Sequence, residues 1–206
     1  QTMSVAQKLY EKGLISYHRT DSVYLSEKAI GDFRKYIEKE YGQNYLSEKV
    51  RVYKNNSKNA QEAHEAIRPT NVSKKSIEGA DSREMKLYEM IWKRAVATQG
   101  AAAKLKNTTI NFSVGKALFQ SKGVRMLFDG FLKITGDKHE DQLLPELKEN
   151  EKIKKKKNWS VESETNPMPR YSDASLVSSL EKQGIGRPST YAPIISTILL
   201  RQYVER

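Results

Sequence analysis

The sequence contains no cysteine, which excludes disulfide bonds, a thiolate nucleophile and a cysteine-based zinc site. Its three histidines, His18, His64 and His139, are not spaced as HxH or HxxxH, so a histidine-based metal site is not expected. No apolar run approaches the ~20 residues that cross a membrane, and no signal peptide opens the chain. We therefore expect a cytoplasmic protein with no membrane partner.

The chain is also poor in negative charge relative to positive charge. Over 206 residues it has 36 Lys and Arg against 25 Asp and Glu, a net charge of +11. Such a balance favours an anionic partner, nucleic acid above all, although a merely basic protein would show it too. The chain starts with Gln1 rather than methionine, and we expect it to be a piece of something longer.

The order of apolar and turn-forming residues predicts an α+β fold with several domains. Helical spacing of apolar residues predicts helices over 4–13, 27–42 and 83–103, the last two capped by Ser26 and Ser82. Strand-forming stretches at 108–114, 116–123 and 124–134 predict an antiparallel sheet of short strands. Pro167 and Pro169 mark a linker before two further helices, predicted over 171–184, with Ser172 or Asp173 as its cap, and 191–204. We expect a helical domain at 1–104, part of an antiparallel β domain at 105–166 and a helical segment at 167–206.

The first candidate site is the stretch GLISYHRTDS at 13–22. A phenol is a poor nucleophile at neutral pH, but a cation within ~4–6 Å favours its phenolate form. Arg19 follows Tyr17 by two residues, so in an extended segment both side chains share a face, and a guanidinium fits phosphate oxygens. Tyr17 and Arg19 would then be nucleophile and phosphate clamp; the alternative is a core tyrosine beside a surface arginine. His18 would face the opposite side, and we predict that it is not the general base.

Two later stretches also suit an anion. QEAHEAIRPT at 61–70 places His64 and Arg68 four residues apart, on one face of a short helix expected over 61–67. A solvated helix end would give the same pattern. GIGRPST at 184–190 combines two glycines with Arg187, Ser189 and Thr190 just before a helix, where free N–H groups and the helix dipole attract negative charge.

Together these three stretches closely resemble the signature segments of type IA DNA topoisomerases. GLISYHRTDS is similar to their active-site segment, QEAHEAIRPT matches their second motif, and SLVSSLEKQGIGRPSTYAPIISTI at 175–198 resembles the third. The resemblance extends over essentially the whole chain, and order and spacing are similar to bacterial topoisomerase I. It implies an isomerase that cleaves and rejoins one DNA strand and relaxes negative supercoils in the bacterial cytoplasm, associated with the nucleoid.

The resemblance also implies residue roles. Tyr17 would attack a phosphate of single-stranded DNA and form a 5′-phosphotyrosine link, with Arg19 holding that phosphate. DNA or phosphate contacts would come from His64, Arg68, Arg187, Ser189, Thr190 and Arg201. Ser16 and His18 stand where threonine and methionine are common in bacterial enzymes, and histidine at that position is also familiar from reverse gyrases, which leaves a part of a reverse gyrase as an alternative.

The magnesium ion of this family is held by an acidic Toprim domain upstream, and only 16 residues precede Tyr17. We therefore expect no metal or cofactor bound by this stretch, and no cleavage activity when it is alone. The chain could instead act as a stand-alone module that binds single-stranded DNA. Because the family builds its β domain from two separate segments, we also expect exposed strand edges and self-association.

Overall fold

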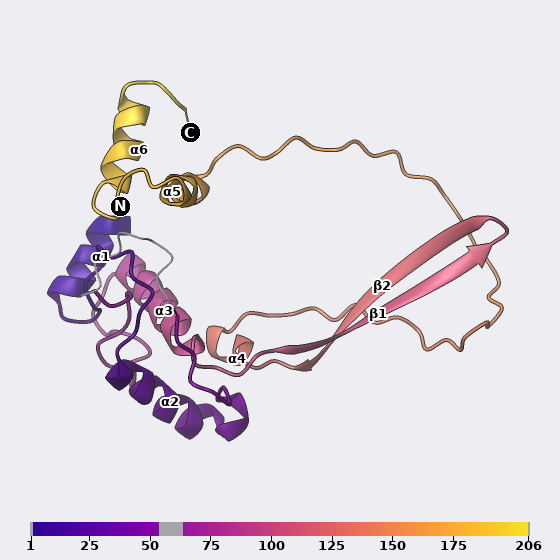
Figure 1. The fold of residues 1–206 in the computed structure, drawn as a ribbon, viewed down its shortest axis with the longest axis horizontal. Coiled ribbons are helices and arrows are strands. Elements are labelled where there is room, and N and C mark those ends of the chain that lie inside the picture. Colours follow the sequence, from indigo (N-terminus) through magenta and orange to yellow (C-terminus); the bar gives the residue numbers. More distant parts are fainter. Residues whose placement is uncertain (1, 54–63, 206) are drawn as a thin grey trace.

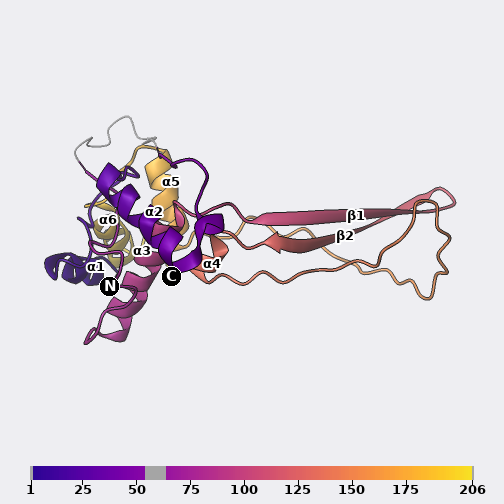
Figure 2. The ribbon, with the colours of Figure 1, turned by 90° about the horizontal axis from the view of Figure 1, so that it is seen from below.

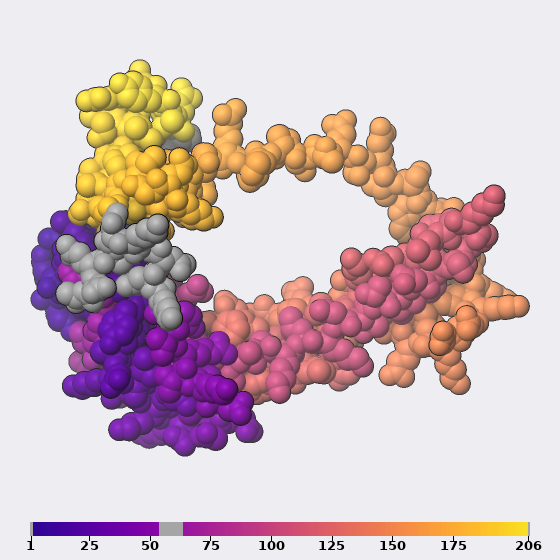
Figure 3. Space-filling view, in the orientation of Figure 1, coloured from indigo at the N-terminus to yellow at the C-terminus, as the bar shows by residue number. Residues whose placement is uncertain are grey.

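A computed structural model describes residues 2–53 and 64–205. It consists of a helical body, a long β-hairpin and a C-terminal pair of helices, and the chain traces an open ring between them (Figure 1, Figure 3). This arrangement confirms the expected α+β class. The elements in order are α1 Thr2–Glu11, α2 Glu27–Tyr41, the 3-10 turn η1 Gln43–Tyr45, α3 Ser82–Ala97, β1 Lys104–Val114, β2 Ala117–Phe128, α4 Leu132–Thr135, α5 Asp173–Lys182 and α6 Tyr191–Leu200.

The hydrophobic core lies within the helical body. It joins α1, α2, α3 and α4 through fully or nearly fully buried side chains, among them Leu9, Phe33, Ile37, Trp92, Val96 and Ile134. Ile15, in the stretch that follows α1, is 1% exposed and belongs to the same core. The segment that carries Tyr17 therefore starts from a fixed point in the core.

Helix α2 forms as the sequence predicts. Ser26 accepts a hydrogen bond from the Ala29 N–H and caps the helix, while Ile30, Phe33 and Ile37 form its buried stripe. Gly42, with φ of 94°, ends it, a backbone conformation that a side chain would make costly.

Helix α3 differs from its prediction at both ends. Asp81, not Ser82, is the N-cap, and its carboxylate accepts from the N–H groups of Arg83 and Glu84 at 2.8 and 2.9 Å. The helix ends at Ala97 rather than continuing to residue 103. Tertiary contacts stop it: the side chain of Gln99 is fully buried and bonds to both backbone groups of Arg51.

The predicted sheet of short strands is one long antiparallel hairpin. β1 and β2 pair from Val114 and Ala117 at the turn down to Lys104 and Phe128, and Gly115 has φ of 59° in that turn. The hairpin reaches away from the helical body (Figure 2). The expected strand over 124–134 is wrong in its second half, because 124–128 continues β2 and 132–135 forms the short helix α4. Along the described residues, the outer edge of β2 is bridged only at Val124, by Gln142.

The C-terminal helices lie beside the helical body, and α6 is close to α1 in both ribbon views (Figure 1, Figure 2). Of the two predicted caps of α5, Ser172 is the one used, in a reciprocal capping box with Ser175. Helix α6 starts at Tyr191 and ends at Leu200, four residues before its predicted end. None of the helices described is long and apolar enough to span a bilayer.

Candidate active site

The Tyr17 segment is joined to the second motif by backbone pairing. Ile15 and Pro69 form an antiparallel bridge, with the Ser16 N–H donating to the Arg68 carbonyl at 2.9 Å and the Thr70 N–H to the Leu14 carbonyl at 3.0 Å. Two stretches that are far apart in sequence thereby become one structural unit, in which the position of one fixes the other.

A single hydroxyl reinforces this joint. The Ser16 Oγ donates to the Ala66 carbonyl at 2.8 Å and accepts from the Arg68 N–H at 2.9 Å. Ser16 is part-buried, so these two backbone groups would lack partners without it.

Tyr17 itself lies at the surface among three other rings. Its side chain is 39% exposed, and its ring centroid lies 5.3 Å from Tyr10, 5.4 Å from His18 and 5.6 Å from His64. All three contacts are edge-to-face, with interplanar angles of 72°, 63° and 66°, a geometry that aromatic rings favour. The four rings, called the aromatic cluster below, fix the nucleophile candidate while leaving it accessible.

The side chains around Tyr17 alternate in exposure. Tyr17 and Arg19 are exposed and His18, between them, is 6% exposed, as an extended segment would require. His18 is nevertheless not separated from Tyr17, since the two rings are in contact. Within the described residues neither ring nitrogen of His18 has a hydrogen-bond partner, so His18 makes no direct hydrogen bond to the Tyr17 hydroxyl.

The expected helix over 61–67 is not found. Residues 61–63 lie outside the described residues, and 64–67 are irregular, so His64 and Arg68 do not share a helical face. His64 lies against Tyr17 instead. The Arg68 guanidinium is bound by Glu65, at 2.6 Å from Nη2 and 3.1 Å from Nε, and has only 20% of its side chain exposed. Arg68 thus holds the motif together rather than pointing outward as a free cation.

Glu65 makes a second link, to the start of α2. Its Oε1 accepts from the Ser26 N–H at 2.8 Å. Burial raises the pKa of Glu65, but hydrogen bonds from Arg68 and Ser26 outweigh it and hold the pKa below its ordinary value. The carboxylate is therefore ionised and couples α2 to the second motif.

The helix of the third motif starts at Tyr191. Burial, and next the negative charge of Glu181, raise the pKa of the Tyr191 phenol; Asp21 adds to this, and the positive charge of Arg187 opposes it. Thr190 Oγ1 accepts from the Arg187 N–H at 2.8 Å and so shapes the turn. Ser189 and Arg201 are exposed, and among the described residues no hydrogen bond or ion pair joins them or Arg187 to Tyr17.

Two contributors to the site were not predicted from the sequence. Tyr10 lies at the end of α1 and looks like any exposed aromatic residue on a helix. Glu65 precedes Arg68 by three residues, a spacing typical of ion pairs, and that signal could have identified it.

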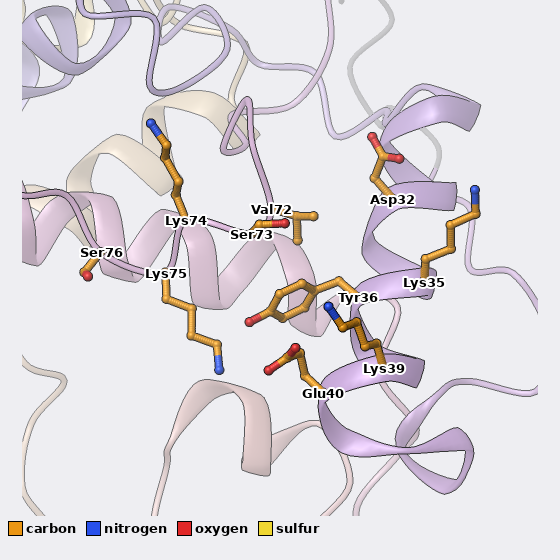
Figure 4. A pocket seen from close by; sticks show the side chains of 10 residues that line it. All are labelled: Asp32, Lys35, Tyr36, Lys39, Glu40, Val72, Ser73, Lys74, Lys75 and Ser76. Carbon is orange, nitrogen blue, oxygen red and sulfur yellow. The ribbon is translucent and has the colours of Figure 1, made fainter.

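A hollow of about 730 Å³ lies elsewhere, between α2 and residues 72–76, and no residue of the three motifs lines it (Figure 4). Its main feature is Lys75, whose Nζ lies 5.6 Å from the ring centroid of Tyr36, 5.3 Å from Tyr41 and 5.8 Å from Trp92. The lysine therefore attaches this loop to the helical body.

The described residues do not fit a magnesium site. In the ranges 2–53 and 64–205, no group of three or more His, Asp or Glu side chains could hold a metal ion. Over these ranges the chain offers a nucleophile candidate and cations for a phosphate, but not the carboxylate cluster that magnesium prefers.

Comparisons with known proteins agree on one family. A family model described as DNA topoisomerase matches residues 1–206. DNA topoisomerase 1 of Helicobacter pylori strain 26695 is 44% identical over 216 aligned residues, covering 100% of this chain and 29% of the relative. DNA topoisomerase 1 of Pseudomonas aeruginosa PAO1 is 46% identical over 209 aligned residues, covering 99% of this chain and 24% of the relative.

A solved structure has a similar fold. Full-length topoisomerase I from Thermotoga maritima superposes with a TM-score of 0.79 at 34% identity, over 99% of this chain and 35% of that one. The chain thus spans less than a third of the length of the curated relatives described here. With a family model matched from end to end, the chain belongs to the bacterial type IA DNA topoisomerases.

Proposed function

We propose that this chain is the part of a longer type IA topoisomerase that supplies the nucleophile for cleavage of single-stranded DNA. The observation that carries the proposal is the position of Tyr17, half-exposed and held between three rings, with the exposed Arg19 two residues away. Phosphoryl transfer depends chiefly on positioning and on neutralising charge, and this pair offers both.

In the proposed reaction the Tyr17 oxygen forms a bond to a backbone phosphorus, and the bond from that phosphorus to the 3′ oxygen breaks. Tyr17 gives up its phenolic proton and the departing 3′ oxygen takes one up, so no proton is gained or lost overall. The product is a 5′-phosphotyrosine and a free 3′ hydroxyl. Religation is the reverse step, which allows another strand to pass while the gate is open and relaxes negative supercoils.

Arg19 stabilises the phosphate during this transfer. Its guanidinium presents several N–H donors in a fixed geometry, which matches the oxygens of a phosphate in the transition state. In this proposal His64 contacts the DNA strand beside the phosphate, and its ring contact with Tyr17 supports that role. Thr190 and Arg187 act from the third motif and Arg201 from the end of α6. The chemistry of the magnesium ion belongs to the part of the enzyme outside this chain.

The test is adduct formation by the full-length enzyme on a labelled single-stranded oligonucleotide, resolved on a denaturing gel. Tyr17→Phe keeps the ring and removes only the hydroxyl, so we expect no covalent adduct. Tyr10→Phe makes the same change on the neighbouring ring and should retain adduct formation. A Tyr17→Phe enzyme that still forms the adduct would rule out the proposal.

A second function is binding without cleavage. The charge of +11 favours association of the isolated chain with single-stranded DNA, in the bacterial cytoplasm and near the nucleoid. The affinity should then fall steeply with salt, with a slope set by the number of phosphates contacted. Affinity that does not change between about 50 and 200 mM salt would exclude it.

We also propose that the isolated chain associates with itself through the hairpin. The strands are long, and Leu118 and Phe119 near the turn are 72% and 58% exposed. Open edges and exposed apolar side chains together favour pairing with another strand. Light scattering should give a mass above that of a monomer, and a monomer at all concentrations would refute this.

A further inference from the structure

His18 forms the buried floor of the aromatic cluster. It is 6% exposed, whereas Tyr10 and Tyr17 above it are 42% and 39% exposed. Its ring centroid lies 5.8 Å from Tyr10 and 5.4 Å from Tyr17, and those two rings lie 5.3 Å apart. The three rings thus contact one another in a triangle, and the imidazole is the least exposed of them.

The polar atoms of this imidazole are not used by the surrounding structure. Nδ1 and Nε2 of His18 are both buried and have no hydrogen-bond partner within the described residues. Buried polar groups are nearly always paired, so a buried group without a partner requires an explanation. Stability does not explain the unpaired imidazole, because an apolar side chain of similar size would fill the space without the cost of burying an unpaired polar group.

We propose that His18 is a positioning residue for Tyr17, and that its buried imidazole holds the tyrosine ring where its hydroxyl can reach a phosphate. The proposal rests on the proposed function, because it assigns His18 a part in the Tyr17 reaction. It gives His18 no role in proton transfer, which agrees with the absence of a hydrogen bond between the two residues.

The charges around His18 make this arrangement sensitive to acid. Burial, and next the positive charge of Arg19, lower the pKa of His18, while Glu11 opposes them more weakly. Among the described residues, the rings in contact with His18 are those of Tyr10 and Tyr17. His18 is therefore neutral at pH 7. Protonation of His18 places a buried positive charge next to Arg19, and the two charges repel each other. The imidazole then shifts to reduce this repulsion, which disturbs its packing against Tyr17.

The test compares two variants in the full-length enzyme, using single-turnover adduct formation on an oligonucleotide between pH 5 and 8. His18→Ala removes the floor and should slow adduct formation about tenfold or more, since small displacements of a reacting group are costly. His18→Met fills the space without a titratable group. It should react within about twofold of the unaltered enzyme at pH 7.5 and lose less of its rate than that enzyme as the pH falls. His139→Ala, a change in a distant histidine, is the control.

The outcomes separate this inference from the proposed function. If His18→Ala forms adduct at the unaltered rate, His18 does not position Tyr17, although Tyr17 can still be the nucleophile. If His18→Met is as acid-sensitive as the unaltered enzyme, the uncharged ring is not what matters, and the inference fails as well. Should alanine prevent folding, as seen by circular dichroism, the pH profile of His18→Met decides alone. If the unaltered enzyme forms no adduct through Tyr17, the proposed function itself fails.

Discussion

The ring of Tyr17 meets the imidazole of His64 edge to face, with centroids 5.6 Å apart and an angle of 66°. The contact joins the first and second motifs at Tyr17, the proposed nucleophile, whose side chain is exposed. It depends on the joint below it, where Ser16, Ala66 and Arg68 are hydrogen-bonded. The second motif therefore serves first as a support for Tyr17, and its residues can be tested as such.

Ser16 is the first residue to test. Ser16→Ala leaves the Arg68 N–H and the Ala66 carbonyl without their partner, so the free energy of unfolding should fall by about 1–3 kcal/mol. Ser16→Thr keeps the hydroxyl and should recover most of this loss. Denaturant unfolding measures both, with the exposed Ser113→Ala as control. An alanine variant as stable as the unaltered protein would show that the joint does not depend on this hydroxyl.

Glu65 should make stability depend on pH. Its pKa is lower in the folded chain, so its contribution is present above its ordinary value of 4.5 and is lost as the pH falls through the lowered pKa. Glu65→Gln should cost about 1–2 kcal/mol at pH 7, because Arg68 loses its ionised partner. The difference from the unaltered protein should shrink below pH 4.5. Unfolding curves at pH 7 and at acid pH test this, and a difference that stays constant would contradict it.

Lys75 offers a test away from the site. Lys75→Met removes the ammonium group from three aromatic rings and should destabilise the helical body by about 0.5–1 kcal/mol. Lys74→Met is the matched control, because its side chain points the opposite way (Figure 4). Thermal unfolding of the two variants should therefore differ, and equal melting temperatures would mean that the cation adds nothing to the packing.

The parts of this structure that follow from local chemistry could be predicted from the sequence. The cap at Ser26 and the apolar spacing of α2 both depend on neighbouring residues, and both were predicted. The three motifs were found for the same reason, since each is a continuous stretch. The inward turn of His18 followed from simple alternation along an extended segment.

The parts that depend on distant residues could not be predicted. The end of α3 is set by Gln99 bonding to Arg51, and the irregular stretch at 64–67 is held by Ser16 and Glu65. The pairing of β1 with β2 decides that two long strands form in place of several short ones. Tyr10 contributes to the site only because the chain turns back after Gly13. Apart from the i,i+3 spacing of Glu65 and Arg68, these contacts leave no periodic signal in the sequence.

Arg19 provides a test of the proposed phosphate clamp. Arg19→Ala should lower the rate of adduct formation by about 100-fold or more, the usual cost of losing one well-placed transition-state donor. Arg19→Lys keeps the positive charge but not the planar set of N–H donors, so it should restore only part of the rate of adduct formation. The control is Arg83→Ala, an exposed arginine at the start of α3. Full activity of the alanine variant in single-turnover assays would remove Arg19 from the mechanism.

The most direct measurement is to locate the DNA on the protein. The covalent complex formed by the full-length enzyme is trapped with denaturant, digested with protease and nuclease, and sequenced by mass spectrometry. The account predicts a nucleotide attached through its 5′ phosphate to the hydroxyl of Tyr17. A nucleotide attached instead to Tyr10, Tyr24 or any other residue would contradict it.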